Sequence, residues 1–314
     1  MINDRLCNPH ENKTMIKYLL VSSFVFFGFV SQAQPTISFT FDDGITESRG
    51  GFQFEKWNEM ILQSLDKAKI KSVFFVKTED KASEKGAYLL NSWNERGHKI
   101  ANHTNSHPNF NRKTITAEDF RNELLKADSL IKNYNNYVKL FRFPYLKEGN
   151  AQAKIDSIRQ VLKSNGYENG YVTIDASDWY VDSRLRKRLN EDAKADISAF
   201  KKFYLEHLFD RANFYEDLAF KLTGRHINHT LLLHHNLTLA LFLSDLISMF
   251  KEKGWNVISA DEAFKDPIFK QIPNHAGESL IWALAKDSGK FEDVLRYPAE
   301  DSRYEKDRMD ELGL

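Results

Sequence analysis

Short runs of β-branched and aromatic residues alternate along this chain with longer stretches in which apolar residues recur at helical spacing. Each pair of such segments is typical of a β-strand followed by a helix. The runs that predict strands are residues 36–41, 72–76, 99–101, 138–143, 170–174, 230–233 and 255–258. About seven strands in one continuous alternation favour an α/β fold with a closed (β/α) barrel over two small domains, and an open doubly wound sheet is the second choice.

Two of the predicted helices have recognisable ends. Thr116 and Asp119 form a capping-box-like start, after which apolar residues recur at helical spacing as far as Ile131. A second helix is predicted for residues 239–253, where Gly254 ends it.

Two stretches depart from the simple alternation of strand and helix. Residues 184–224 have the pattern of two charged amphipathic helices, and the tail after residue 265 has no clear strand pattern. We therefore predict a barrel domain at residues 34–265 with a helical insertion, and a C-terminal extension at residues 266–314 that packs on the barrel.

The amino-terminal segment differs from the rest of the chain. Residues 18–30 carry no charge, Lys17 precedes them, and the small residue Ala33 follows shortly after. This apolar run is shorter than the ~20 residues that a membrane-spanning helix needs. The pattern predicts a secretory signal peptide at residues 1–33, and therefore export to the periplasm or the medium with no membrane span left after cleavage. An uncleaved anchor is the alternative, and translation from Met15 would leave out residues 1–14.

Composition narrows the possible partners. The chain has 314 residues, with 44 Lys or Arg against 44 Asp or Glu, and 42% of its residues are hydrophobic. A zero balance, with no basic stripe and no phosphate-binding Gly-rich loop, argues against nucleic-acid binding. The one cysteine, Cys7, lies in the predicted signal peptide. A metal site in the mature chain must therefore use His, Asp and Glu.

Polar clusters follow five of the predicted strands. They are Asp42-Asp43, His103 with His107, Arg142 with Tyr145, Asp175 to Trp179, and His234-His235. Because the carboxyl ends of barrel strands converge on one face, we expect these clusters to lie together. Each cluster alone has an ordinary explanation, such as a turn, a surface ion pair or a buried core residue, and it is their combination that indicates a site.

The types of residue in these clusters indicate metal chemistry. One Asp and two His suit Zn²⁺, or Co²⁺, Mn²⁺ or Fe²⁺, and leave positions open for water. Neighbouring side chains of a strand point to opposite sides, so only one of His234 and His235 faces the metal, and we favour His234.

The same motifs, in this order, resemble those of the NodB-homology polysaccharide deacetylases, carbohydrate esterase family 4. The matching segments are Thr40 to Gly44, His103 to His107, Arg142 to Tyr145, Asp175 to Trp179, and Leu232 to His234. The resemblance covers roughly residues 36–260. It implies a distorted (β/α) barrel, NodB-like, and metal-dependent removal of an acetyl group from a sugar.

The resemblance also implies a role for each group at the reacting centre. Asp43, His103 and His107 would hold one divalent ion, with Zn²⁺ first and Co²⁺ or Mn²⁺ as alternatives. Asp42 would be the general base and His234 the general acid, a division that suits hydrolysis by activated water.

Five further residues would support these groups. By resemblance, Arg142 orients Asp42, and Asp178 orients His234. The backbone N–H of Tyr145 would stabilise the oxyanion, while Leu232 and Trp179 would wall the pocket for the acetyl methyl group.

Two positions depart from the family pattern. Leu146 stands where the family often has glycine, so we expect the loop beyond Tyr145 to run differently. His235-Asn236 replaces the more common His-Asp, which makes His235 a rival for the role of acid.

The sequence thus predicts an exported metal-dependent deacetylase that acts on a carbohydrate such as peptidoglycan or a chitin-like oligosaccharide, with an N-acetyl amide favoured over an O-acetyl ester. The alternatives on the same fold are an acetylxylan-type esterase, a hydrolase of small cyclic amides and a non-catalytic carbohydrate-binding relative. A non-haem iron oxygenase also uses two His and one carboxylate, but the second acid, Asp42, has no place there.

Overall fold

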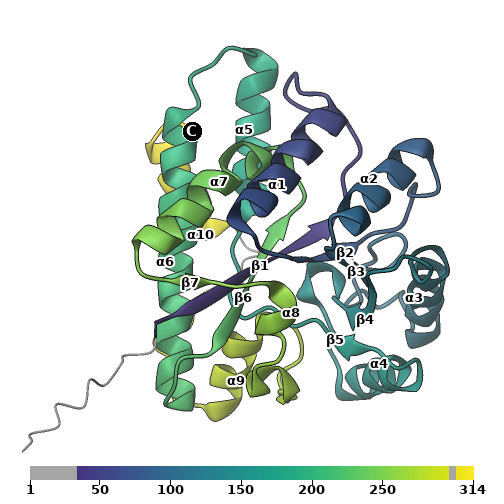
Figure 1. The fold of residues 1–314 in the computed structure, drawn as a ribbon. Coiled ribbons are helices and arrows are strands. Elements are labelled where there is room, and N and C mark those ends of the chain that lie inside the picture. The colour runs from purple at the N-terminus through teal and green to yellow at the C-terminus, as the bar shows by residue number, and fades with distance from the viewer. Residues whose placement is uncertain (1–33, 297–301) are drawn as a thin grey trace, which may run out of the picture. The chain divides into compact units, whose positions relative to one another are not determined.

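A parallel sheet of seven strands lies at the centre of the computed structural model, which describes residues 34–296 and 302–314 (Figure 1). The predicted signal peptide lies outside the described residues. The strands are β1 Thr36–Asp43, β2 Val73–Val76, β3 Lys99–Asn102, β4 Tyr137–Phe141, β5 Glu168–Asn169, β6 Asn228–His234 and β7 Asn256–Val257. Their order is β5-β4-β3-β2-β1-β6, and β7 pairs with the start of β1.

A single short segment joins the two outer strands of this sheet. After β5, which pairs with β4, the Gly170 N–H donates to the Phe141 carbonyl (2.7 Å). Ile174 then forms an isolated parallel bridge with Leu231 of β6, and Leu232 N–H donates to the Ile174 carbonyl (3.1 Å). The sheet therefore curls into the distorted (β/α) barrel that the sequence predicts.

The strand predicted at residues 170–174 is wrong in its position. The ladder lies at Glu168–Asn169, and only Ile174 bridges to β6. The segment crosses from one edge of the sheet to the other, so it cannot run alongside either edge for its whole length. The other six predicted strands are present, with ends shifted by a few residues.

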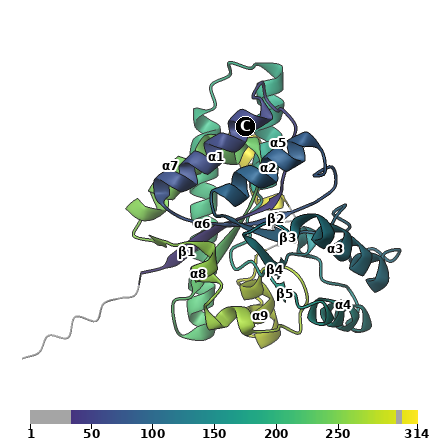
Figure 2. The same ribbon diagram turned by 45° about the vertical axis from the view of Figure 1, so that its right-hand side comes forward.

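Helices cover the outside of the sheet. They are α1 Phe54–Ala68, α2 Glu84–Glu95, α3 Ala117–Ile131, α4 Gln152–Ser164, α5 Asp178–Glu191, α6 Ser198–Thr223, α7 Leu237–Glu252, α8 Ala260–Ala263, α9 Leu280–Ser288 and α10 Arg303–Glu311, with short 3₁₀ turns at Pro144–Leu146 and Pro267–Lys270. In Figure 2, α3 and α4 lie beside β4 and β5, whereas α1, α2 and α7 cover the part of the sheet around β1 and β2.

Capping explains where two of these helices begin. The capping box predicted for α3 is present, since Thr116 Oγ1 accepts from the Asp119 N–H (3.1 Å) and Asp119 Oδ2 from the Thr116 N–H (2.9 Å). The helix predicted at residues 239–253 is α7. It begins earlier, at Leu237, because the Asn236 side chain accepts from the Leu239 N–H (2.8 Å).

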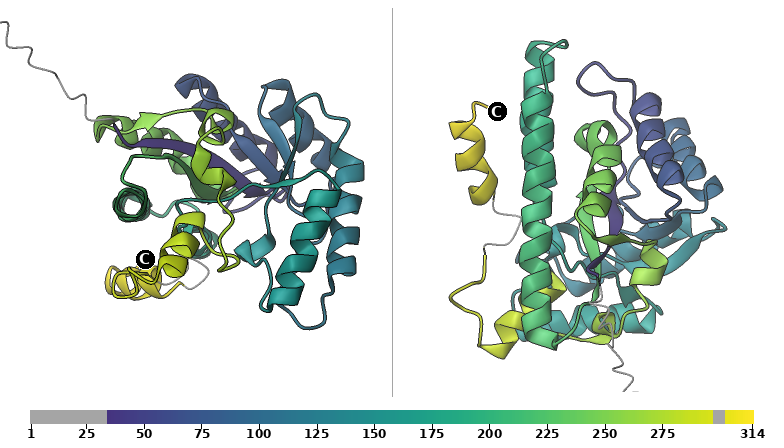
Figure 3. Two further views of the ribbon diagram at one scale, coloured as in Figure 1. Left: turned by 90° about the horizontal axis from the view of Figure 1, so that it is seen from below. Right: turned by 60° about the vertical axis from the view of Figure 1, so that its left-hand side comes forward.

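The two charged helices predicted within residues 184–224 are α5 and α6, although α5 begins earlier, at Asp178. Figure 3 shows α6 as a long helix with α10 beside it. Glu305 of α10 approaches His207 of α6 (3.1 Å), and Arg184 of α5 donates to Asp310 (2.7 Å). The segment after residue 265 thus lies against both helices.

Alternation along β1 separates the barrel interior from the layer of helices. Phe39 and Phe41 contact the rings of Phe250 and Trp93, with centroids 5.9 and 5.4 Å apart. Fully burying one such ring contributes ~1.5–3 kcal/mol. Asp42 points the other way, into the barrel, and is also buried. Within residues 34–296 and 302–314, no helix is both long enough and apolar enough to span a bilayer.

Candidate active site

Strand register brings the polar clusters together at one end of the barrel. Asp42 lies opposite His234 in the ladder between β1 and β6. Asp43 shares a row of the sheet with Asn102 of β3 and Phe141 of β4. His103 follows Asn102 and Arg142 follows Phe141, so these two side chains begin at the same level of the sheet.

Backbone hydrogen bonds continue this row beyond the strands. The Lys77 N–H donates to the Asp43 carbonyl (2.9 Å), and the His103 N–H to the Val76 carbonyl (3.1 Å). One residue further, the Thr78 N–H donates to the Thr104 carbonyl (3.1 Å). The loops that carry Asp43 and His103 are therefore linked to each other by main-chain bonds.

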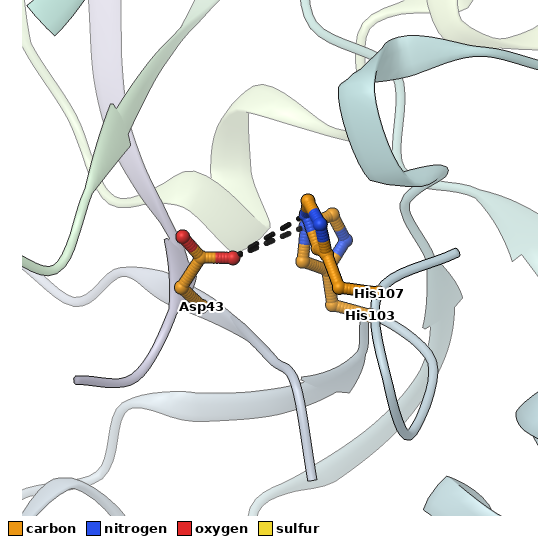
Figure 4. A group of neighbouring side chains, drawn as sticks. All are labelled: Asp43, His103 and His107. Carbon is orange, nitrogen blue, oxygen red and sulfur yellow. Dashed lines mark ion pairs between the residues drawn. The ribbon is translucent and has the colours of Figure 1, made fainter. Parts of the chain in front are cut away.

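Asp43, His103 and His107 form a group that could hold a metal ion, with one ligand atom from each within 4.8 Å of the others (Figure 4). The Asp43 Oδ1 atom lies 3.8 Å from His103 Nε2 and 3.5 Å from His107 Nε2. Asp43 and His107 have positive φ angles of 80° and 63°. Such backbone is uncommon outside glycine and concentrates at functional sites.

The donor set fits a divalent cation. Asp43 Oδ1 is buried and has no hydrogen-bond partner among the described residues, as expected of an oxygen that binds a cation instead. His103 Nδ1 lies 2.8 Å from the Arg142 carbonyl, which can only accept, so this nitrogen carries the proton and Nε2 keeps its lone pair. Burial lowers the pKa of both histidines to about 4, which leaves the rings neutral and able to ligate.

Asp42 lies beside this group but is held differently. The Arg142 Nη1 donates to Asp42 Oδ1 (2.6 Å) and to Thr40 Oγ1 (2.9 Å), and the Arg142 Nε donates to the Gly170 carbonyl (3.0 Å). The guanidinium also stacks over the Phe75 ring, 3.8 Å from its centroid. Burial raises the pKa of Asp42, and the Arg142 charge opposes that rise. One carboxylate oxygen is thus fixed, and the other is not held by this arginine.

His234 faces the two aspartates from β6. Its Nδ1 lies 2.7 Å from Asp178 Oδ1, and its backbone N–H donates to Asp178 Oδ2 (2.9 Å). Burial by itself lowers the pKa of His234, but the charge and hydrogen bond of Asp178, together with the charges of Asp43 and Asp42, raise it to about 10. The ring is therefore protonated at neutral pH, as a proton donor must be.

His235 points to the opposite side of β6, as strand alternation predicts. Its ring lies among aromatic rings of the helix layer, 4.6 Å from the Trp57 ring, and its Nε2 lies 3.0 Å from Asn58 Oδ1. Burial lowers its pKa to about 3. Since His235 is fully buried away from the cleft, it has no access to a substrate.

Two adjoining cavities open at this group, and both are lined by Asp43, His107, Trp179 and His234. The first cavity, of about 420 Å³, extends over the loop after β4 and over Leu232. The second cavity, of about 410 Å³, extends over the loops after β1 and β2 and the start of α5. The group therefore lies between two spaces that a ligand can enter.

The remaining predicted residues line the first cavity. Tyr145 is 41% exposed, and its ring lies 4.6 Å from that of His107. The two hydrogen bonds of the turn around Tyr145 are donated by the N–H groups of Leu146 and Lys147. Neither bond involves the Tyr145 N–H. Leu232 is buried in a small apolar cluster, and Trp179 borders both cavities.

The residues that pack around Leu232 in the wall of the first cavity were not predicted from the sequence. Leu146 packs with Val172 and Leu232, and its φ of 55° lies in the left-handed region that favours glycine. From the tail, the Glu278 N–H donates to the Leu146 carbonyl (3.2 Å), and the Leu280 N–H to the Val172 carbonyl (2.7 Å). Leu146 stood out in the sequence, but no pattern in the tail indicated these contacts.

Comparison with known proteins finds a family match for the first part of the chain. The family model described as "Polysaccharide deacetylase" matches residues 30–170, a stretch that includes Asp42, Asp43 and both candidate histidine ligands. The match covers a little under half of the chain, and within that stretch the sequence is similar to this family. A peptidoglycan-N-acetylglucosamine deacetylase from Bacillus cereus is 28% identical to this chain over 124 residues, which is 39% of this chain and 40% of that protein. The match thus spans well under half of the curated relative.

Solved structures share the fold of this chain at low identity. The chitin deacetylase of the fungus Colletotrichum lindemuthianum is 18% identical with a TM-score of 0.51, over 74% of this chain and 88% of that one. A carbohydrate esterase family 4 pseudoenzyme from Bacillus anthracis is also 18% identical, with a TM-score of 0.52 over 73% and 65%. At this identity the likeness concerns the fold alone.

Proposed function

We propose that this chain is a metal-dependent hydrolase that removes acetyl groups from a carbohydrate, with an N-acetyl amide favoured over an O-acetyl ester. The observation that carries the proposal is the division of labour between two adjacent carboxylates. The Oδ1 atom of Asp43 has no hydrogen-bond partner among the described residues and lies close to two neutral histidines. Asp42, by contrast, is held by a buried arginine. A histidine with a raised pKa stands opposite.

In the proposed reaction, Asp43, His103 and His107 hold one divalent ion, Zn²⁺ first and Co²⁺ or Mn²⁺ next. Such an ion, when bound, polarises the acetyl carbonyl and makes water more acidic. Asp42 accepts the proton of the attacking water on Oδ2, the oxygen that the arginine does not hold. His234 donates its Nε2 proton to the leaving nitrogen as the carbon–nitrogen bond breaks, so that acetate and a free amine result.

Four residues support this reaction in our proposal. Arg142 keeps Asp42 oriented, and Asp178 keeps His234 protonated and fixed in direction. The first cavity receives the acetyl group, with the Tyr145 N–H as a donor to the developing oxyanion. Leu232 and the Trp179 ring exclude water around the methyl group.

We infer the substrate class from the names of the relatives and from the predicted signal peptide. The named deacetylases act on N-acetylglucosamine in peptidoglycan and on chitin, and both substrates carry N-acetyl amides. An export signal at residues 1–33 would bring the chain to such polymers in the periplasm or outside the cell. We propose residues 34–265 as the catalytic barrel and residues 266–314 as an extension that packs on it.

The test is release of acetate from N-acetylated chito-oligosaccharides, peptidoglycan and acetylxylan, before and after removal of metal and with Zn²⁺ or Co²⁺ added back. We expect the amide substrates to react, and Asp42→Asn to lower kcat by ~10²–10⁴-fold. Asp80→Asn, an exposed carboxylate of the second cavity, is the matched control. Absence of release from every substrate would instead indicate a non-catalytic relative, and full activity of Asp42→Asn would refute the assigned base.

A further inference from the structure

The second cavity contains a basic side chain that forms no ion pair with the described residues. Three of the four Lys or Arg residues that line it form ion pairs with acids of the same cavity. These pairs are Lys77–Glu79 (3.1 Å), Arg49–Glu47 (2.8 Å) and Arg186–Asp182 (2.6 Å). The fourth residue is Lys81, which forms no ion pair with any carboxylate in the described part of the chain.

Lys81 is also unusually buried for a lysine. It is 6% exposed, and its ammonium donates to the Glu79 carbonyl (3.2 Å). An ammonium group has three donors. Burying a charge without a partner of opposite charge is costly, which is why buried lysines are normally paired. Burial, together with the charge of Lys77, lowers the pKa of Lys81, and the charges of Asp80, Asp43 and Glu47 oppose this shift without cancelling it.

The backbone around Lys81 holds this side chain in place. The Lys81 N–H donates to the Thr78 carbonyl (3.0 Å). The start of α2 packs directly on it, since a Cβ atom at Gly86 would lie 2.3 Å from the Lys81 Cα. The side chain runs past Gly44, where a Cβ atom would lie 3.3 Å from Lys81 Cε. Because Gly44 follows Asp43 directly, the lysine lies close to the proposed metal group.

We propose that Lys81 is a substrate-recognition residue, which binds a carboxylate carried by the sugar next to the acetylated unit or by that sugar's substituent. This inference rests on the proposed function, because it places the acetyl group in the first cavity and the neighbouring sugar in the second. The three ion-paired cations are already neutralised, whereas Lys81 keeps donors for a ligand. A charge-assisted hydrogen bond is strong enough to set specificity.

The experiment compares two forms of one ligand. The probe is the disaccharide of N-acetylglucosamine and N-acetylmuramic acid with its lactyl carboxylate free, and the control ligand is the same disaccharide with that carboxylate converted to a primary amide. Binding is measured by calorimetry on zinc-loaded protein in an Asp42→Asn background, which prevents turnover. We expect the free acid to bind about tenfold more tightly than the amide.

Three variants at two positions make this result specific. Lys81→Met keeps the length of the side chain without the charge, and it should bring the ratio of the two affinities close to one. Lys81→Arg should keep the preference for the acid. Lys85→Met, an exposed lysine of α2, is the matched control and should behave as the unsubstituted protein does. Zinc content and thermal unfolding of each variant show whether the fold is retained.

Equal binding of acid and amide by the unsubstituted protein would overturn the proposal. So would a Lys81→Met variant that weakens both ligands by the same factor, because a neutral acceptor or a structural role would do that. Acetate release by protein with Asp42 intact tests the proposed function separately. If no acetate is released but the free acid still binds more tightly than the amide, the proposed reaction is refuted and the proposed carboxylate site stands.

Discussion

The pair of His234 and Asp178 offers the sharpest test of the electrostatics in this site. Asp178 is fully buried and accepts from both the ring and the backbone of His234, at 2.7 and 2.9 Å. Replacing Asp178 by Asn keeps the size of the side chain but removes its charge. The preference of His234 for its protonated form should then decrease, because burial opposes protonation and only the charges of Asp43 and Asp42 remain to favour it.

The size of this effect follows from the raised pKa. A pKa of about 10, against an ordinary value of 6.5, corresponds to ~5 kcal/mol of preference for the protonated ring, since one unit is worth about 1.4 kcal/mol. Breaking a buried charge pair costs ~3–5 kcal/mol, which is of the same order. We therefore expect Asp178→Asn to move the titration of His234 to lower pH by ~2 pH units or more.

Two assays report this change. In metal-free protein, the imidazole NMR signals of His234, assigned with a His234→Gln variant, give its titration directly. In zinc-loaded protein, the alkaline limb of kcat/KM against pH should move in the same direction, because a deprotonated His234 cannot act as an acid. Asp80→Asn is the control for removing a negative charge from the same cleft.

The sign of the effect also applies to stability. Because folding raises the pKa of His234, the pair contributes fully below pH 6.5, and this contribution is lost as the pH rises through about 10. An unchanged titration of His234 in Asp178→Asn, or an alkaline limb that stays in place while kcat decreases, would refute the assignment of the raised pKa to Asp178.

Three further changes have predictable results. Gly277→Ala should destabilise the fold by ~2 kcal/mol, because φ is +89° and the new Cβ would lie 2.6 Å from the Leu146 carbonyl oxygen. Thermal unfolding should show a smaller loss for Gly289→Ala, which has a similar φ but open space around it, and equal losses would contradict the role of the clash. Asp43→Ala should abolish tight zinc binding in equilibrium dialysis without unfolding the protein, and retained stoichiometric binding would place the ion elsewhere. His235→Leu should make the free energy of unfolding less dependent on pH between 6.5 and about 3, since the buried ring of His235 must stay neutral. In urea unfolding, the slope of this free energy against pH should decrease by ~1.4 kcal/mol per pH unit. An unchanged slope would mean that another group takes up the proton.

Much of the fold and the grouping of the site could be predicted because both follow from local pattern. The run that ends at Asp42 is apolar and β-branched, and the polar residues come directly after it. Parallel strands place such ends at one level, so the register that joins Asp42 to His234 is a consequence of the barrel. Alternation along β6 likewise separates His234 from His235.

The wall of the first cavity could not be predicted because it depends on contacts between distant parts of the chain. Leu146 adopts a left-handed backbone, and the tail around Gly277 packs on it. No periodicity connects a tail residue with a loop far earlier in the chain. The strand predicted at residues 170–174 is wrong for a similar reason, since its course is set by the two sheet edges that it joins.

The main-chain bonds between the loops after β1, β2 and β3 have a consequence for how an ion would enter. The Asp43 carbonyl and the His103 N–H both belong to this network through residues 76 and 77, so the candidate ligands stand on backbone that is already hydrogen-bonded. Where a site has to be formed on binding, as in a zinc finger, metal uptake is itself a folding reaction. Here the entropy of arranging the ligand-bearing loops is already lost when the sheet forms. Zinc should therefore bind with a small change in heat capacity and at a rate set by access to the cleft.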